Sequence, residues 1–390
     1  MTASLERGAA ENRSEQLTPT GWRRASAAAQ EAAMPLGAVA VTCSAPLGVG
    51  GLGRHLQEIV DALARRGQAT TCVCGSTRER AADRARRRRG SRAVRARIAA
   101  RAIQLPLPLG AALRARGSAG EFDAYASSCL PAAEHLIAFN GQARGQFDAA
   151  ARAHYRSRAL VSANAHMRRV VRQHELARRQ YPLEGSWTGQ MLARNLREYA
   201  QADRVLVASR YIRDSFLEEG FPEERLSWFP LTPDPRFEQR REAPSSDRFE
   251  IVYVGSLAVH KGVPLLIDAF RRLPYDDLRL TLVGGWGTRG MRRFVQRACA
   301  ADQRISAGPG DPLPLLERAS LYVHPAYEDG FGYAAAEALV TGVPVIVSED
   351  TGMKDLIGSI GTGIVVPTGA LETLRDALEA AYRGELFAGA

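Results

Sequence analysis

Two carboxylates lie on either side of a glycine-containing turn in the last quarter of the sequence. Asp329 directly precedes Gly330-Phe331-Gly332, and Glu337 follows the turn inside an alanine-rich stretch. The glycines let the backbone turn sharply and leave N–H groups open at the start of a helix, where they can bind an anion or a hydroxyl group. Eight helical residues span about 12 Å, so the two acids can contact distant parts of one ligand. We therefore expect a large, extended ligand at this turn.

A cationic group is expected from another strand-to-helix loop. Residues 249–255 form an apolar run that predicts a buried strand, and Lys261-Gly262 follows just before a predicted helix that begins at Val263. A lysine at the mouth of such a loop can direct its charge at a phosphate. Only two of the 52 basic residues are lysines. A lysine is therefore unusual in this arginine-rich sequence, which indicates that the larger guanidinium group does not suit position 261.

The residues around the glycine turn match a family signature. Asp329, Gly-Phe-Gly, four residues, Glu337 and a small-residue segment ending in Gly342-Val343-Pro344-Val345 resemble the signature of the retaining, nucleotide-sugar-dependent glycosyltransferases of family 4 (glycosyl transferases group 1). The first acid is commonly glutamate in that family, so Asp329 is one methylene shorter. The resemblance covers roughly residues 36–383. It implies the GT-B fold, an α/β architecture with two Rossmann-like, doubly wound domains that face each other across a cleft.

The resemblance implies four catalytic residues. They are His166, Lys261, Asp329 and Glu337. Lys261 would neutralise the departing diphosphate, Asp329 would accept hydrogen bonds from sugar hydroxyls, and Glu337 would accept them from the ribose. His166 follows a predicted strand of the first domain and would contact the donor sugar or the reacting centre, with His174 as the alternative histidine.

Donor-binding residues are implied in three loops. They are Gly50, Gly51, Ser256, Lys261, Gly330, Phe331, Gly332 and Glu337. Gly50 and Gly51 belong to a glycine loop that would face the donor phosphates and the acceptor. The amides of Phe331 and Gly332 would hold the donor sugar or phosphate. Ser256 stands where many members carry an arginine, which leaves a second positive charge unaccounted for.

Transfer of a sugar from a nucleoside diphosphate needs stabilisation of the charge that grows on the leaving group. GT-B enzymes commonly provide it with lysine and helix N-termini, and the sequence has no Asp-x-Asp metal motif. We therefore expect a metal-independent glycosyltransferase with no cofactor and with a nucleoside-diphosphate sugar as its donor. The acceptor would be a glycan, a lipid-linked molecule or a small molecule. The resemblance implies retention of configuration by front-face attack.

Three other functions are compatible with parts of the sequence. Gly48-x-Gly50-x-x-Gly53 fits the dinucleotide-binding pattern of dehydrogenases, but the next predicted strand ends in Cys74-Gly75-Ser76, without the acid that would hold the ribose. A GT-B sugar-nucleotide epimerase would share the architecture but needs further acids and histidines for elimination. A catalytically impaired relative that only binds nucleotide sugars is suggested by Ser256 and the short C-terminus.

The chain is expected to divide into four parts. Residues 1–34 lack a clear apolar period and are predicted to form a disordered extension. Residues 35–235 open with a βαβ pattern and form the N-terminal, acceptor-binding domain. Residues 236–248 are the hinge linker, and residues 249–390 form the donor-binding domain. Family members usually continue into a helix that crosses back to the first domain, and we expect that helix to be absent here.

Charge and composition limit which partners and which cellular compartment are expected for this protein. Residues 78–116 hold thirteen arginines and two acids, within a chain of formal charge +10. Such a region is either a solvated surface or a peripheral contact with anionic lipids at the inner face of the membrane. Nucleic acid is not expected, because no binding motif accompanies the arginines. No apolar run is long enough to span a membrane, and five scattered cysteines fit a reducing cytoplasm.

Overall fold

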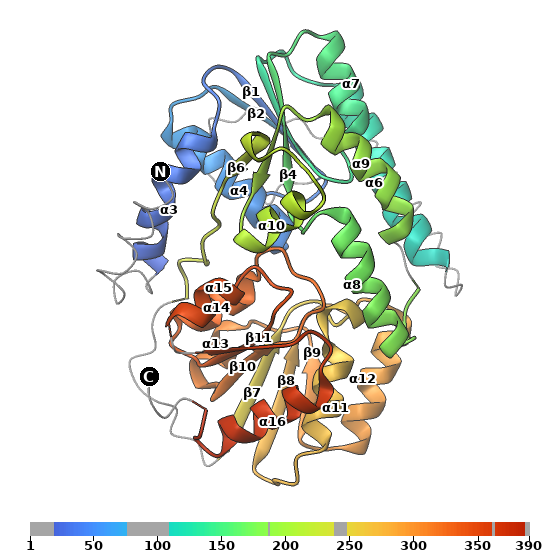
Figure 1. Cartoon of the computed structure of the whole chain (residues 1–390), viewed down its shortest axis with the longest axis vertical. Helices are drawn as coiled ribbons and strands as arrows, with labels where there is room; N and C mark the ends of the chain where they lie inside the picture. Colours follow the sequence, from blue (N-terminus) through green and yellow to red (C-terminus); the bar gives the residue numbers. More distant parts are fainter. Residues whose placement is uncertain (1–18, 76–108, 186–187, 238–247, 361–362, 387–390) are drawn as a thin grey trace. The chain divides into compact units, whose positions relative to one another are not determined.

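The structure is a computed structural model, and it describes residues 19–75, 109–185, 188–237, 248–360 and 363–386. The chain packs into two compact units, each with its own six-stranded sheet (Figure 1). The N-terminal unit contains Ser26–Val171 and Gly185–Leu231. The C-terminal unit contains Arg172–Glu184 and Thr232–Ala390, together with the residues up to Ala25. This organisation confirms the predicted fold of two Rossmann-like α/β domains.

The sheet of the N-terminal unit is entirely parallel and has the strand order β2-β1-β3-β4-β5-β6. Its strands are β1 (Val39–Cys43), β2 (Thr70–Cys74), β3 (His135–Phe139), β4 (Ser157–Ser162), β5 (Arg204–Val207) and β6 (Leu226–Trp228). All five residues of β1 are buried. Burial on both faces explains why these strands read as continuous apolar runs. Strands β1 and β2 agree with the βαβ pattern that the sequence predicts at the start of this domain.

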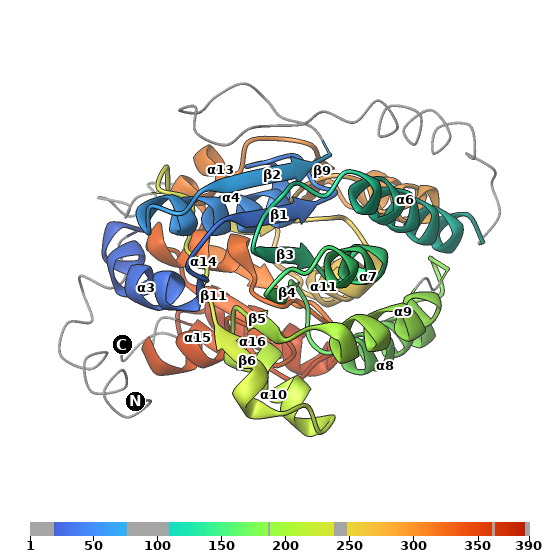
Figure 2. The same ribbon diagram turned by 90° about the horizontal axis from the view of Figure 1, so that it is seen from above.

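The helices of the N-terminal unit follow the strands in alternation. They are α3 (Pro19–Ala33), α4 (Gly50–Arg65), α6 (Leu109–Ser128), α7 (Arg144–Arg152), α8 (Met167–Gln180), α9 (Thr188–Gln201), α10 (Arg210–Glu218) and the 3-10 turn η1 (Glu223–Arg225). In α4, Leu56, Ile59 and Leu63 are buried, as their spacing predicts. Helices α6, α7 and α9 lie side by side (Figure 2). The first part of α3 and the last part of α8 belong to the C-terminal unit.

The sheet of the C-terminal unit is also parallel, with the order β12-β11-β10-β7-β8-β9. Its strands are β7 (Phe249–Val254), β8 (Leu278–Val283), β9 (Ile305–Gly308), β10 (Leu321–His324), β11 (Val345–Ser348) and β12 (Gly363–Val366). Its helices are η2 (Val259–Lys261), α11 (Val263–Arg271), α12 (Arg289–Ala301), α13 (Leu313–Arg318), α14 (Tyr333–Val340), α15 (Lys354–Ile360) and α16 (Leu371–Tyr382). Helices α11, α12 and α16 share one apolar core with the sheet (Figure 1).

Both sheets reverse their strand order at one internal position. In the N-terminal unit the reversal lies between β1 and β3, and in the C-terminal unit it lies between β7 and β10. The loops that leave the two strands at a reversal point turn to opposite faces of the sheet and leave a crevice between them. Open α/β sheets bind their ligands in this crevice, outside the carboxyl ends of the strands. The loops after β7 and β10 are those that carry Lys261 and Asp329.

The prediction of a disordered extension is wrong for the residues that form α3. Ser26, Gln30 and Ala33 recur on one face of this helix and are buried. The Gln30 amide donates to the carbonyl of Pro230 (2.8 Å) and accepts from Arg65 (2.7 Å). Two of the three buried positions are polar, so the helical face has no apolar period in the sequence. Residues 1–18 lie outside the described residues.

The predicted boundary of the first domain also needs correction. Residues 35–235 do not form one unit, because Arg172–Glu184 and Thr232 onwards pack with the C-terminal unit. Helix α8 is continuous across the change from one unit to the other. An uninterrupted helix gives no composition signal at a domain boundary, which explains why the sequence pattern did not predict it. The junction at Leu231 lies a few residues before the predicted hinge linker, residues 236–248.

Most of the basic region predicted at residues 78–116 lies outside the described residues. Within the part of the chain that the structure describes, no helix is both long and apolar enough to cross a membrane. The membrane contact expected of this region stays a prediction.

A small stability prediction concerns the start of α10. Ser209 is its N-cap, and its hydroxyl accepts a hydrogen bond from the amide of Ile212 at 3.2 Å. Ser209→Ala should lower the free energy of unfolding by about 1 kcal/mol, because one buried N–H then loses its acceptor. Urea denaturation followed by circular dichroism would measure this. An unchanged midpoint would show that the cap contributes nothing.

Candidate active site

The Lys261 side chain is presented by a short 3-10 turn between β7 and α11. The turn ends at Gly262, which has φ of 72° and begins α11. A Cβ atom on Gly262 would lie 1.9 Å from the carbonyl oxygen of Pro325. Only glycine therefore allows this turn to approach the end of β10 so closely. The amide of Tyr327 donates to the carbonyl of His260 at 2.8 Å and ties the two loops together.

Lys261, Asp329 and His324 form a hydrogen-bonded cluster at the reversal point of the sheet. The Lys261 ammonium lies 3.0 Å from Oδ2 of Asp329 and donates to the backbone carbonyl of Glu328, also at 3.0 Å. Nε2 of His324, the last residue of β10, lies 2.9 Å from the same Asp329 oxygen. The structure thus brings together the lysine and the first acid that the sequence singles out, and it adds a histidine.

The electrostatics of the cluster keep Asp329 ionised. Burial alone would raise the pKa of Asp329, but the Lys261 charge and the His324 hydrogen bond hold that pKa well below its usual range. Burial raises the pKa values of Tyr253 and Tyr322 well above 10, and the Asp329 charge adds to the effect. Side chains of Lys261 and Asp329 retain 17% and 23% of their exposure, so a ligand can reach the pair. This pair can exchange partners with a bound anion and sugar hydroxyls.

The glycine turn after Asp329 leads into α14 as expected. Gly332 has φ of 88° and is the N-cap residue of α14, so the N-cap position itself has no side chain. Asp329 is fixed through its own backbone, since its N–H donates to Asp350 and its carbonyl accepts from Gly352. Phe331 packs edge-on against Tyr333, with ring centroids 5.0 Å apart. The turn therefore has a defined shape, with backbone amides at its helical end.

Glu337 and Ser256 occupy contrasting environments in the C-terminal unit. The Glu337 side chain is 4% exposed and lies in the middle of α14, where almost every residue is buried. Ser256 is exposed directly after β7, and its carbonyl accepts a hydrogen bond from the Tyr253 hydroxyl at 2.9 Å. The donor-binding role expected of Glu337 stays a prediction, and the Ser256 side chain supplies no positive charge.

His166 lies in the N-terminal unit, in aromatic surroundings. Its ring is 4.8 Å from that of Tyr199 and 5.0 Å from that of Phe216, and its amide donates to Ser215 at 2.7 Å. The residue is almost fully buried. Gly50 and Gly51 form the first turn of α4, and both are exposed. The predicted site residues are thus divided between the units, with Lys261, Asp329, Glu337 and the Gly330–Gly332 turn in the C-terminal one.

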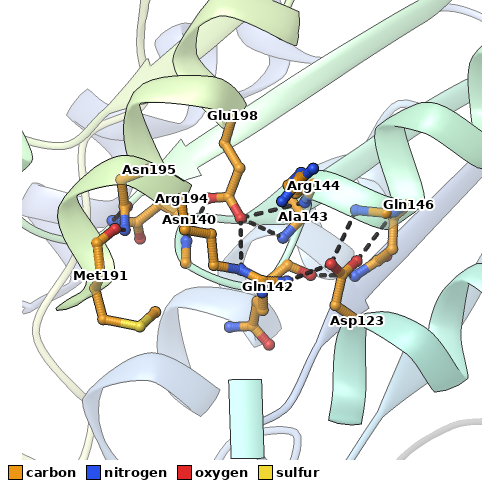
Figure 3. A network of polar contacts seen from close by, with 12 residues as sticks. Asp123, Asn140, Gln142, Ala143, Arg144, Gln146, Met191, Arg194, Asn195 and Glu198 are labelled. Carbon is orange, nitrogen blue, oxygen red and sulfur yellow. Dashed lines mark hydrogen bonds and ion pairs between the residues drawn. The ribbon is translucent and has the colours of Figure 1, made fainter. Parts of the chain in front are cut away.

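The loop at the reversal point of the N-terminal sheet is held by two buried carboxylates (Figure 3). Glu198 of α9 accepts hydrogen bonds from the amides of Gly141 (2.5 Å), Ala143 (2.9 Å) and Arg144 (3.2 Å). Asp123 of α6 accepts from Gly145 (2.8 Å) and Gln146 (3.0 Å). The N-terminal amides of α7 are therefore occupied by the protein's own carboxylates.

Arg194 lies between the two carboxylates and pairs with both. Its guanidinium contacts Asp123, and its Nε is 3.3 Å from Glu198. Burial raises the pKa of Glu198 to about 7 despite the amides and Arg194, and burial also raises the pKa of Asp123. The same loop reaches β1, because Oε1 of Gln142 accepts from the amide of Ser44 at 2.7 Å. The network fixes the loop that leaves β3.

Sequence reasoning missed His324 and the stacked histidine pair beside Lys261. His324 ends β10, and a polar residue at the carboxyl end of a parallel strand is the signal that could have identified it. His174 was the alternative to His166, and its ring stacks on His260 with centroids 4.4 Å apart. Among the described residues, no group of three or more His, Cys, Asp or Glu side chains is arranged to hold a metal ion.

Several known proteins resemble this chain. Capsular polysaccharide biosynthesis glycosyltransferase CapM of Staphylococcus aureus is 24% identical over 149 residues, which cover 37% of this chain and 39% of that protein. A D-inositol 3-phosphate glycosyltransferase of Paenarthrobacter aurescens is 29% identical over 147 residues, 35% of this chain and 36% of that protein. The chain thus spans less than two fifths of the length of these relatives.

Solved structures share the fold over most of the chain. Sucrose-phosphate synthase of Thermosynechococcus elongatus has a TM-score of 0.62 at 17% identity, covering 90% of this chain and 92% of its own. HepE of Anabaena, solved in complex with UDP-glucose, has a TM-score of 0.59 at 16% identity, with coverages of 90% and 92%. At these identities the likeness establishes the architecture.

Family membership rests on two adjoining matches. Residues 49–236 match the family described as Glycosyltransferase Family 4, and residues 235–387 match the family described as Glycosyl transferases group 1. The second match contains Lys261, Asp329 and Glu337 with all strands of the C-terminal sheet, and the first match contains β2 to β6 of the N-terminal sheet. The chain therefore belongs to the group 1 glycosyltransferases, the family 4 enzymes of GT-B fold.

Proposed function

We propose that this protein is a retaining, metal-independent glycosyltransferase that moves a sugar from a nucleoside-diphosphate sugar to a glycan, a lipid-linked molecule or a small-molecule acceptor. The observation that carries the proposal is the Lys261–Asp329 pair at the β7/β10 reversal point, shortly before the N-terminus of α14. The ammonium and the helix N-terminus suit the negative charge of a diphosphate, and the fixed carboxylate can accept hydrogen bonds from sugar hydroxyls.

Related proteins support the choice of donor. HepE of Anabaena was solved with UDP-glucose, and the name of CapM describes a glycosyltransferase of capsular polysaccharide synthesis. HepE shares the architecture of this chain, and CapM is 24% identical to it over 149 residues. We infer a nucleoside-diphosphate sugar as donor, with uridine as the first base to test.

The residues of the site suggest how the transfer is assisted. A diphosphate beside Lys261 would replace Asp329 as the partner of the ammonium, and its growing negative charge would be stabilised as the glycosidic bond breaks. Asp329 would stay in place through His324 and through its own backbone bonds, with its oxygens turned to sugar hydroxyls. In the front-face route, a donor phosphate oxygen takes the proton of the attacking acceptor hydroxyl.

A donor panel tests the proposal. UDP-, GDP- and ADP-linked hexoses would be scored by donor hydrolysis and by thermal shift of the full chain. Wild-type protein should hydrolyse one donor slowly and be stabilised by the matching nucleoside diphosphate. A nucleotide that stabilises the protein while no donor is hydrolysed, with or without added acceptors, would point instead to a nucleotide-sugar-binding relative.

Glu337→Gln gives a prediction on the same panel. A carboxylate that accepts hydrogen bonds from two ribose hydroxyls contributes more than an amide, since bonds to charged groups are worth about 1.5–3 kcal/mol. We expect the donor KM to rise about tenfold or more while kcat changes little. Steady-state kinetics would measure both constants. A fall in kcat at unchanged KM would contradict a ribose-binding role.

The proposed location of the protein is the cytoplasm, in peripheral contact with the inner face of the membrane. Residues 78–116 carry the positive charge on which this part of the proposal rests. Sedimentation with vesicles that contain about 30% of anionic lipid would test it. Binding that is equal on purely zwitterionic vesicles, or absent on both, would contradict it.

A further inference from the structure

Residues 172–184, here called the inserted segment, lie between β4 and β5 in the sequence but pack in the C-terminal unit. The segment comprises the second part of α8 and the four residues that follow it. Ala177 is buried in the same apolar core as β7, α11 and α12, and Tyr181 and Leu183 pack against that core. The Tyr181 hydroxyl donates to Asp268 of α11 at 3.1 Å. The inserted segment is therefore an integral part of the unit that carries Lys261.

The last residue of the inserted segment binds the turn that ends in Lys261. Oε2 of Glu184 accepts a hydrogen bond from the amide of Val259 at 2.8 Å, and Val259 is the first residue of the three-residue turn η2. The Thr288 hydroxyl also donates to Glu184. Burial raises the pKa of Glu184, while these two hydrogen bonds oppose the rise. The carboxylate thus fixes one end of a turn whose other end is Lys261.

His174 fixes the middle of the same turn. Its ring stacks on the ring of His260, with an interplanar angle of 20° and centroids 4.4 Å apart. Burial, together with the charge of Lys261, lowers the pKa of His174 to about 3. Burial, His174 and Lys261 also lower the pKa of His260 well below its usual value, although Asp329 opposes this. Both rings are therefore neutral, and they can pack beside the Lys261 ammonium without repelling it.

The inserted segment also holds the loop of Asp329. The Tyr327 hydroxyl donates to Oε1 of Gln180, and the Gln180 amide donates to the carbonyl of Gly369 at 3.2 Å. Tyr327 lies two residues before Asp329 and is linked to the Lys261 turn through its amide. Both halves of the Lys261–Asp329 pair are consequently supported by one stretch of chain.

We propose that Glu184 and His174 are positioning residues that set the Lys261 ammonium at the distance the donor diphosphate requires. This inference rests on the proposed function, because it assigns Lys261 to the diphosphate. Neither residue touches donor atoms in this proposal. They act through the backbone of Val259 and the ring of His260. Their effect should therefore appear in the catalytic rate, since a displacement of about 1 Å can cost up to 10²-fold.

The experiment compares Glu184→Gln with Glu184→Leu in the full chain. The glutamine variant keeps an oxygen that can accept from Val259, whereas the leucine side chain has a similar volume but no acceptor. Glu184→Leu should lower kcat for the hydrolysed donor about ten- to a hundredfold with a smaller change in KM, and Glu184→Gln should stay within about threefold of wild type. His174→Ala should lower kcat in the same direction. Arg179→Ala is the matched control, because Arg179 lies on the same segment, is 76% exposed and pairs only with Glu175 among the ion pairs described.

Hydrogen–deuterium exchange of the peptide that contains residues 257–262 supplies a readout independent of turnover. Exchange should be faster in the Glu184→Leu variant than in wild type and near wild type in the Glu184→Gln variant. If no donor is hydrolysed even by wild-type protein, the proposed function fails, and exchange alone decides whether Glu184 fixes the turn. The inference is overturned if the Glu184→Leu variant exchanges and turns over like the Arg179→Ala control, or if it loses only thermal stability.

Discussion

Lys261→Ala is expected to lower donor turnover by about 10²–10³-fold, because removal of one well-placed stabilising group commonly has that effect. The ammonium is held 3.0 Å from Asp329 and 3.0 Å from a backbone carbonyl, so it is fixed before the donor binds. Preorganised charge stabilises a leaving diphosphate better than water does, since it does not have to reorient. The donor KM should change less than kcat, because the charge on the diphosphate grows as the bond breaks. Steady-state donor hydrolysis measures both.

Two further variants separate charge from geometry. Lys261→Arg keeps the charge but places a planar fork where a compact ammonium fits between Asp329 and Glu328, so it should restore only part of the rate. Arg271→Ala removes an exposed cation at the far end of α11 and should leave the rate within about twofold. Equal loss in Lys261→Ala and Arg271→Ala would mean that net charge, rather than the position of Lys261, decides the rate. Full activity in Lys261→Ala would refute the assignment of the lysine.

The sequence predicted the C-terminal unit well because its elements are locally encoded. Residues 249–255 form an apolar run with a clear end, and the structure places β7 there and starts α11 at Val263, as predicted. Lys261 and Asp329 could be chosen because each lies in a short loop after an apolar strand. The ion pair between Lys261 and Asp329 could not be predicted, because it depends on β7 and β10 being neighbours in the sheet. The local sequence pattern does not determine the order of strands in a sheet.

The errors have a common physical origin in contacts that the local sequence pattern does not show. The sequence pattern of α3 does not predict a packed helix, because Ser26 and Gln30 on its buried face are polar and Gln30 bonds to Pro230 and Arg65 of other elements. The inserted segment was assigned to the first domain because a continuous helix crosses the change of unit. His324 was overlooked because its importance follows from the approach of Asp329, five residues later, across a turn. In each case the residue type alone gives no signal, and the contact with a neighbouring residue determines its structural role.

Glu198→Ala is expected to cause the largest loss of stability, about 3–5 kcal/mol in the free energy of unfolding. The side chain is completely buried and accepts from three backbone amides, while Arg194 lies beside it. Its removal would leave those amides without their acceptor and Arg194 with Asp123 alone, and breaking a buried pair from one side is strongly destabilising. Urea denaturation would measure the loss. Glu223→Gln, at a surface ion pair with Arg213, is the control and should cost less than about 1 kcal/mol.

The Glu198→Gln variant tests how stability depends on pH. It also provides a second measurement at this position if the Glu198→Ala variant does not fold. The pKa of Glu198 is about 7 in the folded protein, against 4.5 as its ordinary value. Because the folded state binds this proton more tightly, the contribution to stability is fully present below pH 4.5 and is lost as pH rises through 7. The wild-type free energy of unfolding should therefore fall relative to that of Glu198→Gln by about 2–3 kcal/mol between roughly pH 5 and pH 8. A difference that stays constant over this range would mean that the three amides and Arg194 keep Glu198 ionised in the folded protein, and that burial does not dominate at this site.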